Sequence, residues 1–124
     1  MSSSPLYHKT VLPNGIRVVS GPMTGVRSAS LIFYYNVGSR YERPELSGVS
    51  HFLEHMLFKG TEKRPDPMQI SQAIEGIGGI LNAATGREST SYWAKVPSTH
   101  FAMSYEVLAD IIRNSVIDSV ELEK

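Results

Sequence analysis

Cysteine is absent from this 124-residue sequence, and neither acidic nor basic residues are in excess. The lack of cysteine excludes a disulfide scaffold and any thiolate metal site, so a bound metal would have to rest on histidine and carboxylate ligands. Twelve basic and twelve acidic residues give a net charge of zero. Because no basic stripe runs along the chain, the electrostatic signature of a nucleic-acid-binding protein is missing, and we expect no nucleic-acid partner.

Long hydrophobic runs are also missing. No apolar stretch approaches the ~20 residues that a membrane-spanning helix needs, so we expect no membrane partner. Residues 1–5 have neither the basic nor the apolar region of a secretory signal, and we interpret them as a flexible tail. A hydrophobic content of 41% supports one folded domain over residues 6–124. These features favour the cytoplasm, or the mitochondrial matrix where a targeting segment has been removed.

The hydrophobic pattern predicts strands and helices in the order βββααββα, which indicates a layered α+β domain. Asn14-Gly15 joins the first two strands and is a strong hairpin signal, because both residues accept positive φ. The third strand has an almost continuous apolar run and is expected at the centre of a sheet, covered on both faces. Asp66 and Gln69 are spaced as a capping box at the start of the second helix. The expected strands are 7–12, 16–20, 28–36, 80–85 and 89–96, and the expected helices are 45–58, 66–78, 98–113 and the start of another at 118–124.

One motif in the first predicted helix has the pattern of a metal site. His51, Glu54 and His55 share one face of a helix that advances about 100° per residue. Two imidazoles one turn apart can bind the same zinc ion, and the carboxylate between them can take a proton from a water molecule. The alternative interpretation is the ordinary solvated face of an amphipathic helix. We expect the helix to pack through an apolar stripe on its opposite side, made of Val49, Phe52, Leu53, Met56 and Leu57.

The other histidines and carboxylates are more typical of surface groups. Glu106 and Asp110 share one side of the predicted third helix, and we interpret them as solvated rather than as ligands. His8 and His100 are isolated from the motif, and we assign neither of them a role.

The residues around the motif extend the pattern to most of the chain. Residues 47–61, SGVSHFLEHMLFKGT, closely resemble the active-site helix of the M16 metallopeptidases, the family of pitrilysin, insulin-degrading and mitochondrial processing peptidases. Residues 12–18 resemble the opening hairpin of that family, residues 78–90 the segment after its second helix, and residues 108–111 a later helix. The smaller, processing-peptidase-like branch fits best. The resemblance implies a layered LuxS and processing-peptidase-like metallohydrolase fold, a mixed β-sheet with helices packed on it. Residues 6–124 would be the N-terminal part of the peptidase domain.

The resemblance also implies the chemistry. A family member would be a zinc endopeptidase that hydrolyses extended peptides, with His51 and His55 as Zn²⁺ ligands and Glu54 as general base. An edge strand containing Asn82, Ala83 and Ala84 would hold the substrate by backbone pairing. From the residues alone, this segment would be interpreted as an ordinary hairpin strand.

The family's third zinc ligand is a glutamate roughly 75 residues after the second histidine, which corresponds to about position 130, beyond Lys124. We therefore expect residues 1–124 alone to have little or no activity. Family members close a second half or subunit around the peptide, so the rest of the peptidase and such an M16-type half are the expected partners. A non-catalytic scaffold or peptide-binding subunit of the same family is the alternative. The intact His51, Glu54 and His55 favour the peptidase, because non-catalytic relatives usually have degenerate motifs.

Overall fold

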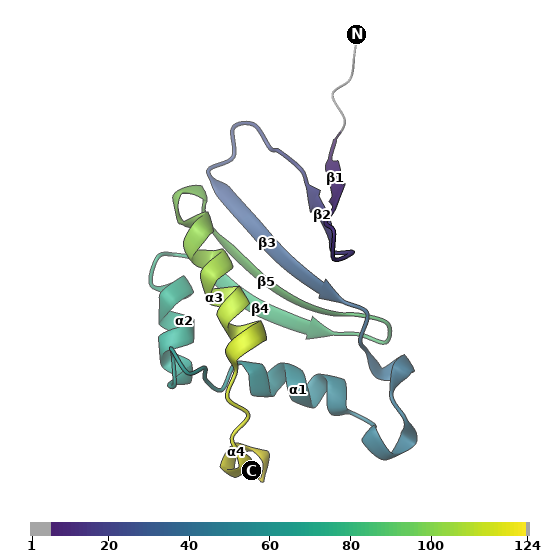
Figure 1. The fold of residues 1–124 in the computed structure, drawn as a ribbon. Coiled ribbons are helices and arrows are strands. Elements are labelled where there is room, and N and C mark those ends of the chain that lie inside the picture. The colour runs from purple at the N-terminus through teal and green to yellow at the C-terminus, as the bar shows by residue number, and fades with distance from the viewer. Residues whose placement is uncertain (1–5, 124) are drawn as a thin grey trace.

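The computed structural model describes residues 6–123, so the tail predicted at residues 1–5 lies outside the described residues. The chain is α+β, and its main elements follow the predicted order, with one further helical turn at the end (Figure 1). The strands are β1 (His8–Val11), β2 (Arg17–Ser20), β3 (Ser28–Tyr35), β4 (Ile80–Thr85) and β5 (Thr90–Pro97). The helices are α1 (Val49–Leu57), α2 (Pro67–Glu75), α3 (Phe101–Asn114) and α4 (Ser119–Leu122), with short 3-10 turns η1 (Ser39–Tyr41), η2 (Pro44–Leu46) and η3 (Ser98–His100).

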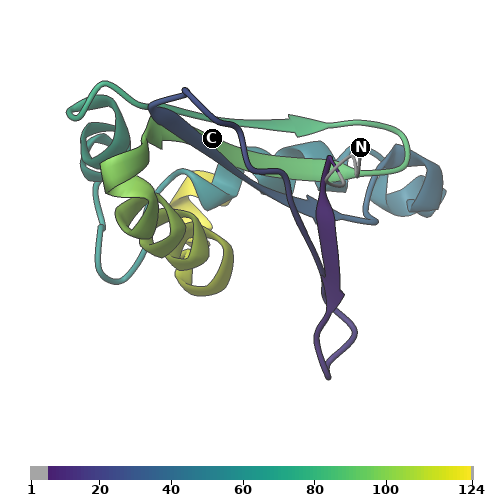
Figure 2. The ribbon, with the colours of Figure 1, turned by 90° about the horizontal axis from the view of Figure 1, so that it is seen from above.

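The strands form two separate antiparallel sheets. β1 and β2 make a hairpin that projects away from the rest (Figures 1 and 2), and its turn places Gly15 at a φ of 88°. The second sheet has the order β3-β5-β4. Within residues 6–123 all strand pairs are antiparallel, so the expected mixed sheet is wrong for this part of the chain.

The predicted central position of β3 is also wrong, because β5 is central and β3 lies at an edge. The continuous apolar run of β3 suggested burial on both faces, but its side chains alternate. Leu31 and Phe33 pack against the core, whereas Ile32 and Tyr34 are exposed on the opposite face. When the exposed face of a strand also carries apolar residues, its sequence pattern is the same as that of a strand buried on both faces.

Helices α2 and α3 cover the same face of the three-stranded sheet (Figure 2). The core lies between them and β5, and its buried members are Ile70, Ile74, Val96, Val107 and Ile111, with Tyr92, Ala94 and Leu108 beside them. The capping box of α2 is confirmed, since the Asp66 side chain accepts from the Met68 amide and the Gln69 side chain accepts from the Asp66 amide. None of the helices in the described part of the chain has the length and hydropathy of a membrane span.

Helix α1 packs by a different face from the predicted one. It begins at Val49 rather than at residue 45, because Gly48 has a left-handed φ of 89° that interrupts the helix. The predicted apolar stripe is largely exposed, and Phe52 has 45% of its surface accessible. Of that stripe only Met56 is fully buried, whereas Ser50 and Glu54 are buried in its place. The helix lies next to β4 (Figure 1), and the Glu54 side chain contacts Thr85 of that strand.

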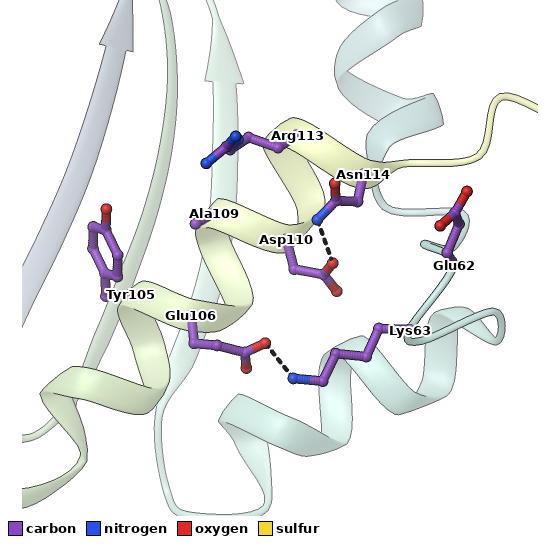
Figure 3. A pocket seen from close by; sticks show the side chains of 8 residues that line it. All are labelled: Glu62, Lys63, Tyr105, Glu106, Ala109, Asp110, Arg113 and Asn114. Atoms are coloured by element: carbon purple, nitrogen blue, oxygen red, sulfur yellow. Dashed lines mark hydrogen bonds and ion pairs between the residues drawn. The ribbon is translucent and has the colours of Figure 1, made fainter.

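A buried polar cluster joins α3 to the loop after α1, and it corrects the interpretation of Asp110 as a solvated group. Asp110 is 6% exposed. Its carboxylate accepts from the Thr61 hydroxyl at 2.7 Å, from Arg64 at 2.8 Å and from Asn114 at 3.0 Å. Glu106 is more exposed and binds both Arg64 and Lys63. Figure 3 shows the ion pair between Glu106 and Lys63.

The charges of this cluster are stabilised by their neighbours. Hydrogen bonds from Arg64 and then Lys63 lower the pKa of Glu106 below its usual 4.5. Burial opposes ionisation of Asp110, but the hydrogen bonds from Thr61, Asn114 and Arg64 outweigh it and leave the pKa of Asp110 below its usual 3.8. Both acids are therefore held as carboxylates, which fixes the loop after α1 against α3.

Candidate metal centre

Helix α1 brings the three residues of the sequence motif together. The Nε2 atoms of His51 and His55 lie 2.9 Å apart, and their ring centroids are separated by 4.5 Å. Ligand atoms of His51, Glu54 and His55 all lie within 4.8 Å of one another. Both imidazoles are exposed, whereas Glu54 is only 8% exposed. The helix therefore presents two nitrogen donors to solvent and one carboxylate at the junction with the sheet.

The donor set and its spacing fit a zinc ion. Two nitrogens at 2.0–2.1 Å from a tetrahedral ion would be about 3.3 Å apart, a few tenths of an ångström more than the observed separation. Imidazole nitrogen and carboxylate oxygen are ligands that zinc accepts. A small rotation of either ring would therefore suffice for both histidines to bind one ion.

Thr85, the last residue of β4, orients the Glu54 carboxylate. Its hydroxyl donates a hydrogen bond to Glu54 Oε2 across the junction between α1 and the sheet. The sequence pattern did not single out Thr85 for this role. The signal was available, because side chains alternate along a strand and Thr85 must face opposite to Ala84.

Tyr92 on β5 lies near the same carboxylate. Burial raises the pKa of Tyr92 to about 12, and the charges of Glu54 and Tyr35 add to the effect. The phenol therefore stays protonated over the whole neutral range. Tyr92 also packs edge-to-face on Tyr35, with 6.1 Å between the ring centroids.

The predicted substrate segment lies on an edge strand. Among the described residues, β4 pairs only with β5, so its other side is free. Asn82 and Ala84 are exposed, and Ala83 is half-buried on the face that carries Thr85. The Asn82 side-chain oxygen Oδ1 accepts from the Ala83 N–H at 2.8 Å, so it is already bound to the strand's own backbone. An incoming peptide that used this amide would have to displace that contact.

Comparison with known proteins relates this chain to peptidases. Residues 17–124 match the family model described as Insulinase (Peptidase family M16). The chain is 42% identical over 115 residues to an uncharacterized zinc protease of Streptomyces coelicolor, which covers 93% of this chain and 25% of that protein. It is 44% identical over 120 residues to the mitochondrial-processing peptidase subunit beta of Rattus norvegicus, covering 97% of this chain and 24% of that protein.

A solved structure shares the fold. A protease from Helicobacter pylori superposes with a TM-score of 0.88 at 29% identity, over 96% of this chain and 29% of that chain. The chain thus spans about a quarter of the length of the curated relatives that it matches.

Proposed function

Because this chain belongs to peptidase family M16, the insulinase family, we propose that it forms the zinc-binding part of an endopeptidase that cleaves extended peptides. The family assignment confirms the resemblance found in the sequence. The observation that carries the proposal is the buried Glu54 carboxylate, which Thr85 orients beside two exposed imidazoles on the same helix. In this proposal, residues 6–124 are the N-terminal part of the peptidase domain.

The proposed division of roles follows from the positions of the three side chains. His51 and His55 would hold the zinc ion through their Nε2 atoms. A bound zinc ion supplies Lewis-acid polarisation of a peptide carbonyl and of a water molecule. Glu54 accepts the proton of the attacking water on a carboxylate oxygen and later transfers it to the leaving amine nitrogen. The Thr85 hydroxyl keeps that carboxylate in one orientation during both transfers.

The free edge of β4 is the proposed docking site for the peptide. Unpaired backbone groups on an edge strand can pair with any extended chain, and side-chain pockets then add preference. Ala83 and Ala84 are small enough for the substrate to approach closely. Asn82 would contribute after its side chain leaves the Ala83 amide.

The remaining part of the site is expected outside this chain. We propose a glutamate at about position 130 as the third ligand, since a catalytic zinc site needs three protein ligands. A relative named as a subunit of a mitochondrial processing peptidase supports an M16-type partner subunit or half. The same name supports a mitochondrial location, for which we propose the matrix, with the cytoplasm as the alternative.

A second candidate function is a non-catalytic peptide-binding subunit, favoured only by the free edge of β4. The test uses the intact protein that contains this chain and measures zinc content and peptide cleavage together. His51→Ala should lose most of its zinc affinity and its cleavage, whereas Glu54→Gln should keep zinc and lose cleavage. Cleavage by Glu54→Gln at the wild-type rate would contradict the role of the general base. A wild-type protein that binds peptide without cleaving it would favour the second function.

A further inference from the structure

The start of helix α1 has no cap of its own. Its N-cap residue is Gly48, which has no side chain and therefore cannot accept from the first amides of the helix. A residue outside the helix instead binds the amide of Ser50 and the amide of Gly48 itself. The Glu42 carboxylate accepts from the Gly48 N–H at 2.6 Å and from the Ser50 N–H at 3.2 Å.

The carboxylate of Glu42 is well suited to accept hydrogen bonds from two amides at the start of α1. The hydrogen bond from the Gly48 amide lowers the pKa of Glu42, so the group is ionised at neutral pH. An ionised carboxylate has two acceptor oxygens, and here each oxygen takes one amide. A negative charge is also favourable at the positive end of a helix. Glutamine could offer one oxygen only, and its NH₂ group would face an amide donor.

The position of Glu42 is set by the hairpin between β4 and β5. Backbone hydrogen bonds run from the Ser39 amide to Gly86 and from the Arg40 amide to Arg87. Gly38 lies so close to this hairpin that an added Cβ would be 2.6 Å from its backbone. The same hairpin carries Thr85 at its start, so it contacts the motif helix directly through Thr85 and also binds the segment that carries Glu42.

Loss of the Glu42 cap would affect the two histidines differently, because they lie in different turns of α1. His51 directly follows Ser50 and lies in the first turn of α1, whereas His55 lies one turn later, near Met56, which is buried. Loss of the cap would loosen the first turn and His51, and it would leave His55 in place. Two imidazoles can share an ion only while both turns stay helical.

We propose that Glu42 is a positioning residue of the metal centre: it holds the first turn of α1 in helical form and so keeps His51 within reach of the ion that His55 binds. This inference rests on the proposed zinc site. Glu42 itself does not contact the histidines in this role. It acts through the backbone, and its effect on zinc should therefore pass entirely through His51.

The test is a double-mutant cycle on zinc affinity in the intact protein, with zinc ions alone as the probe and a competing chelator as the readout. Glu42→Gln should weaken zinc binding about tenfold, the size of effect seen for groups that orient a ligand. In a His51→Ala background, where the remaining ligands hold zinc with a much lower but measurable affinity, the same change should have no further effect, because the residue through which it acts is gone. Glu45→Gln is the matched control, since Glu45 is an exposed acid in η2, and it should leave zinc affinity unchanged.

If Glu42 only stabilised the fold, Glu42→Gln would weaken zinc binding whether or not His51 were present. Equal weakening by Glu42→Gln with and without His51 would overturn the inference. Glu42→Asp keeps the charge but has a shorter reach, so it should give an intermediate loss, and it carries the test if Glu42→Gln does not fold. Wild-type zinc affinity in His51→Ala would overturn both this inference and the proposed function. Loss of zinc in His51→Ala with none in Glu42→Gln would overturn the role of Glu42 alone.

Discussion

Two buried carboxylates in this chain have opposite surroundings. Asp110 is surrounded by the Arg64 guanidinium and two further hydrogen-bond donors, so its charge is neutralised within the protein. Glu54 is almost equally buried, yet among residues 6–123 its one hydrogen-bond donor is the neutral Thr85 hydroxyl. A buried carboxylate that makes no ion pair with a protein side chain is typical of a functional site rather than of a structural ion pair. The comparison separates a carboxylate that stabilises the fold from one that is available for proton transfer.

The largest expected effect on stability is at Asp110. Replacing it by asparagine removes one of the two carboxylates that bind the Arg64 side chain, which is only 15% exposed, and leaves the more exposed Glu106 as its one acidic partner among the described residues. Removing one member of a buried ion pair typically costs 3–5 kcal/mol, so Asp110→Asn should lower the free energy of unfolding by about 3 kcal/mol. Urea denaturation followed by circular dichroism measures this change. Glu54→Gln is the matched variant and should change the same quantity by less than about 1 kcal/mol. Equal losses in the two variants would remove the distinction between the two carboxylates.

The second largest effect is expected from acid, which should lower the contribution of Asp110 and Glu106 to the free energy of unfolding. The pKa values of Glu106 and Asp110 are both lowered in the folded protein, so their contribution to stability is complete above their usual values of 4.5 and 3.8. It is lost as the pH falls through the lower folded-state values. The free energy of unfolding should therefore decrease from about pH 5 to about pH 3, and Asp110→Asn should show a shallower decrease. A variant with the wild-type slope would mean that Asp110 is not linked to this titration.

At the metal centre, removal of the Thr85 hydroxyl should affect catalysis more than metal binding. Thr85→Val keeps the shape of the side chain but leaves Glu54 without its donor. We expect kcat to fall about tenfold in the intact protein while zinc affinity stays unchanged, because a misplaced general base slows proton transfer. Steady-state cleavage and chelator competition measure the two quantities. Thr10→Val, at an exposed position on β1, is the control. Loss of zinc in Thr85→Val would show that Thr85 supports the ligands and not the base.

The smallest effect is expected on the edge strand. Adding an unstructured peptide should protect the backbone amides of residues 82–85 from hydrogen exchange, if β4 accepts an extended chain. Ala84→Pro removes one donor and blocks close approach, so the protection should disappear. Protection in β1 or β2 instead would place peptide binding on the other sheet.

These two carboxylates also show how far the sequence could be read. Local patterns predicted the Asn14-Gly15 hairpin, the Asp66 capping box and the shared helix face of the histidine motif, since each depends on residues a few positions apart. The burial of Asp110 could not be predicted in that way, because its partner Arg64 is 46 residues distant.

The orientation of α1 was missed for the same reason. Its apolar stripe predicted the buried side, but contacts with β4, about thirty residues later, turn Glu54 inward and leave Phe52 exposed. Glu42 and Thr85 also contact the motif helix from outside it. The motif itself can thus be predicted from the sequence, whereas the residues that orient it can be identified only from the tertiary fold.

The most direct test of this account compares Glu54→Gln and Asp110→Asn in the intact protein, each measured for cleavage rate per folded molecule and for free energy of unfolding. We predict that Glu54→Gln keeps its stability and its zinc but loses cleavage, while Asp110→Asn loses stability and its folded molecules still cleave peptide. Cleavage by Glu54→Gln at the wild-type rate, or an equal loss of cleavage in folded Asp110→Asn, would contradict the account.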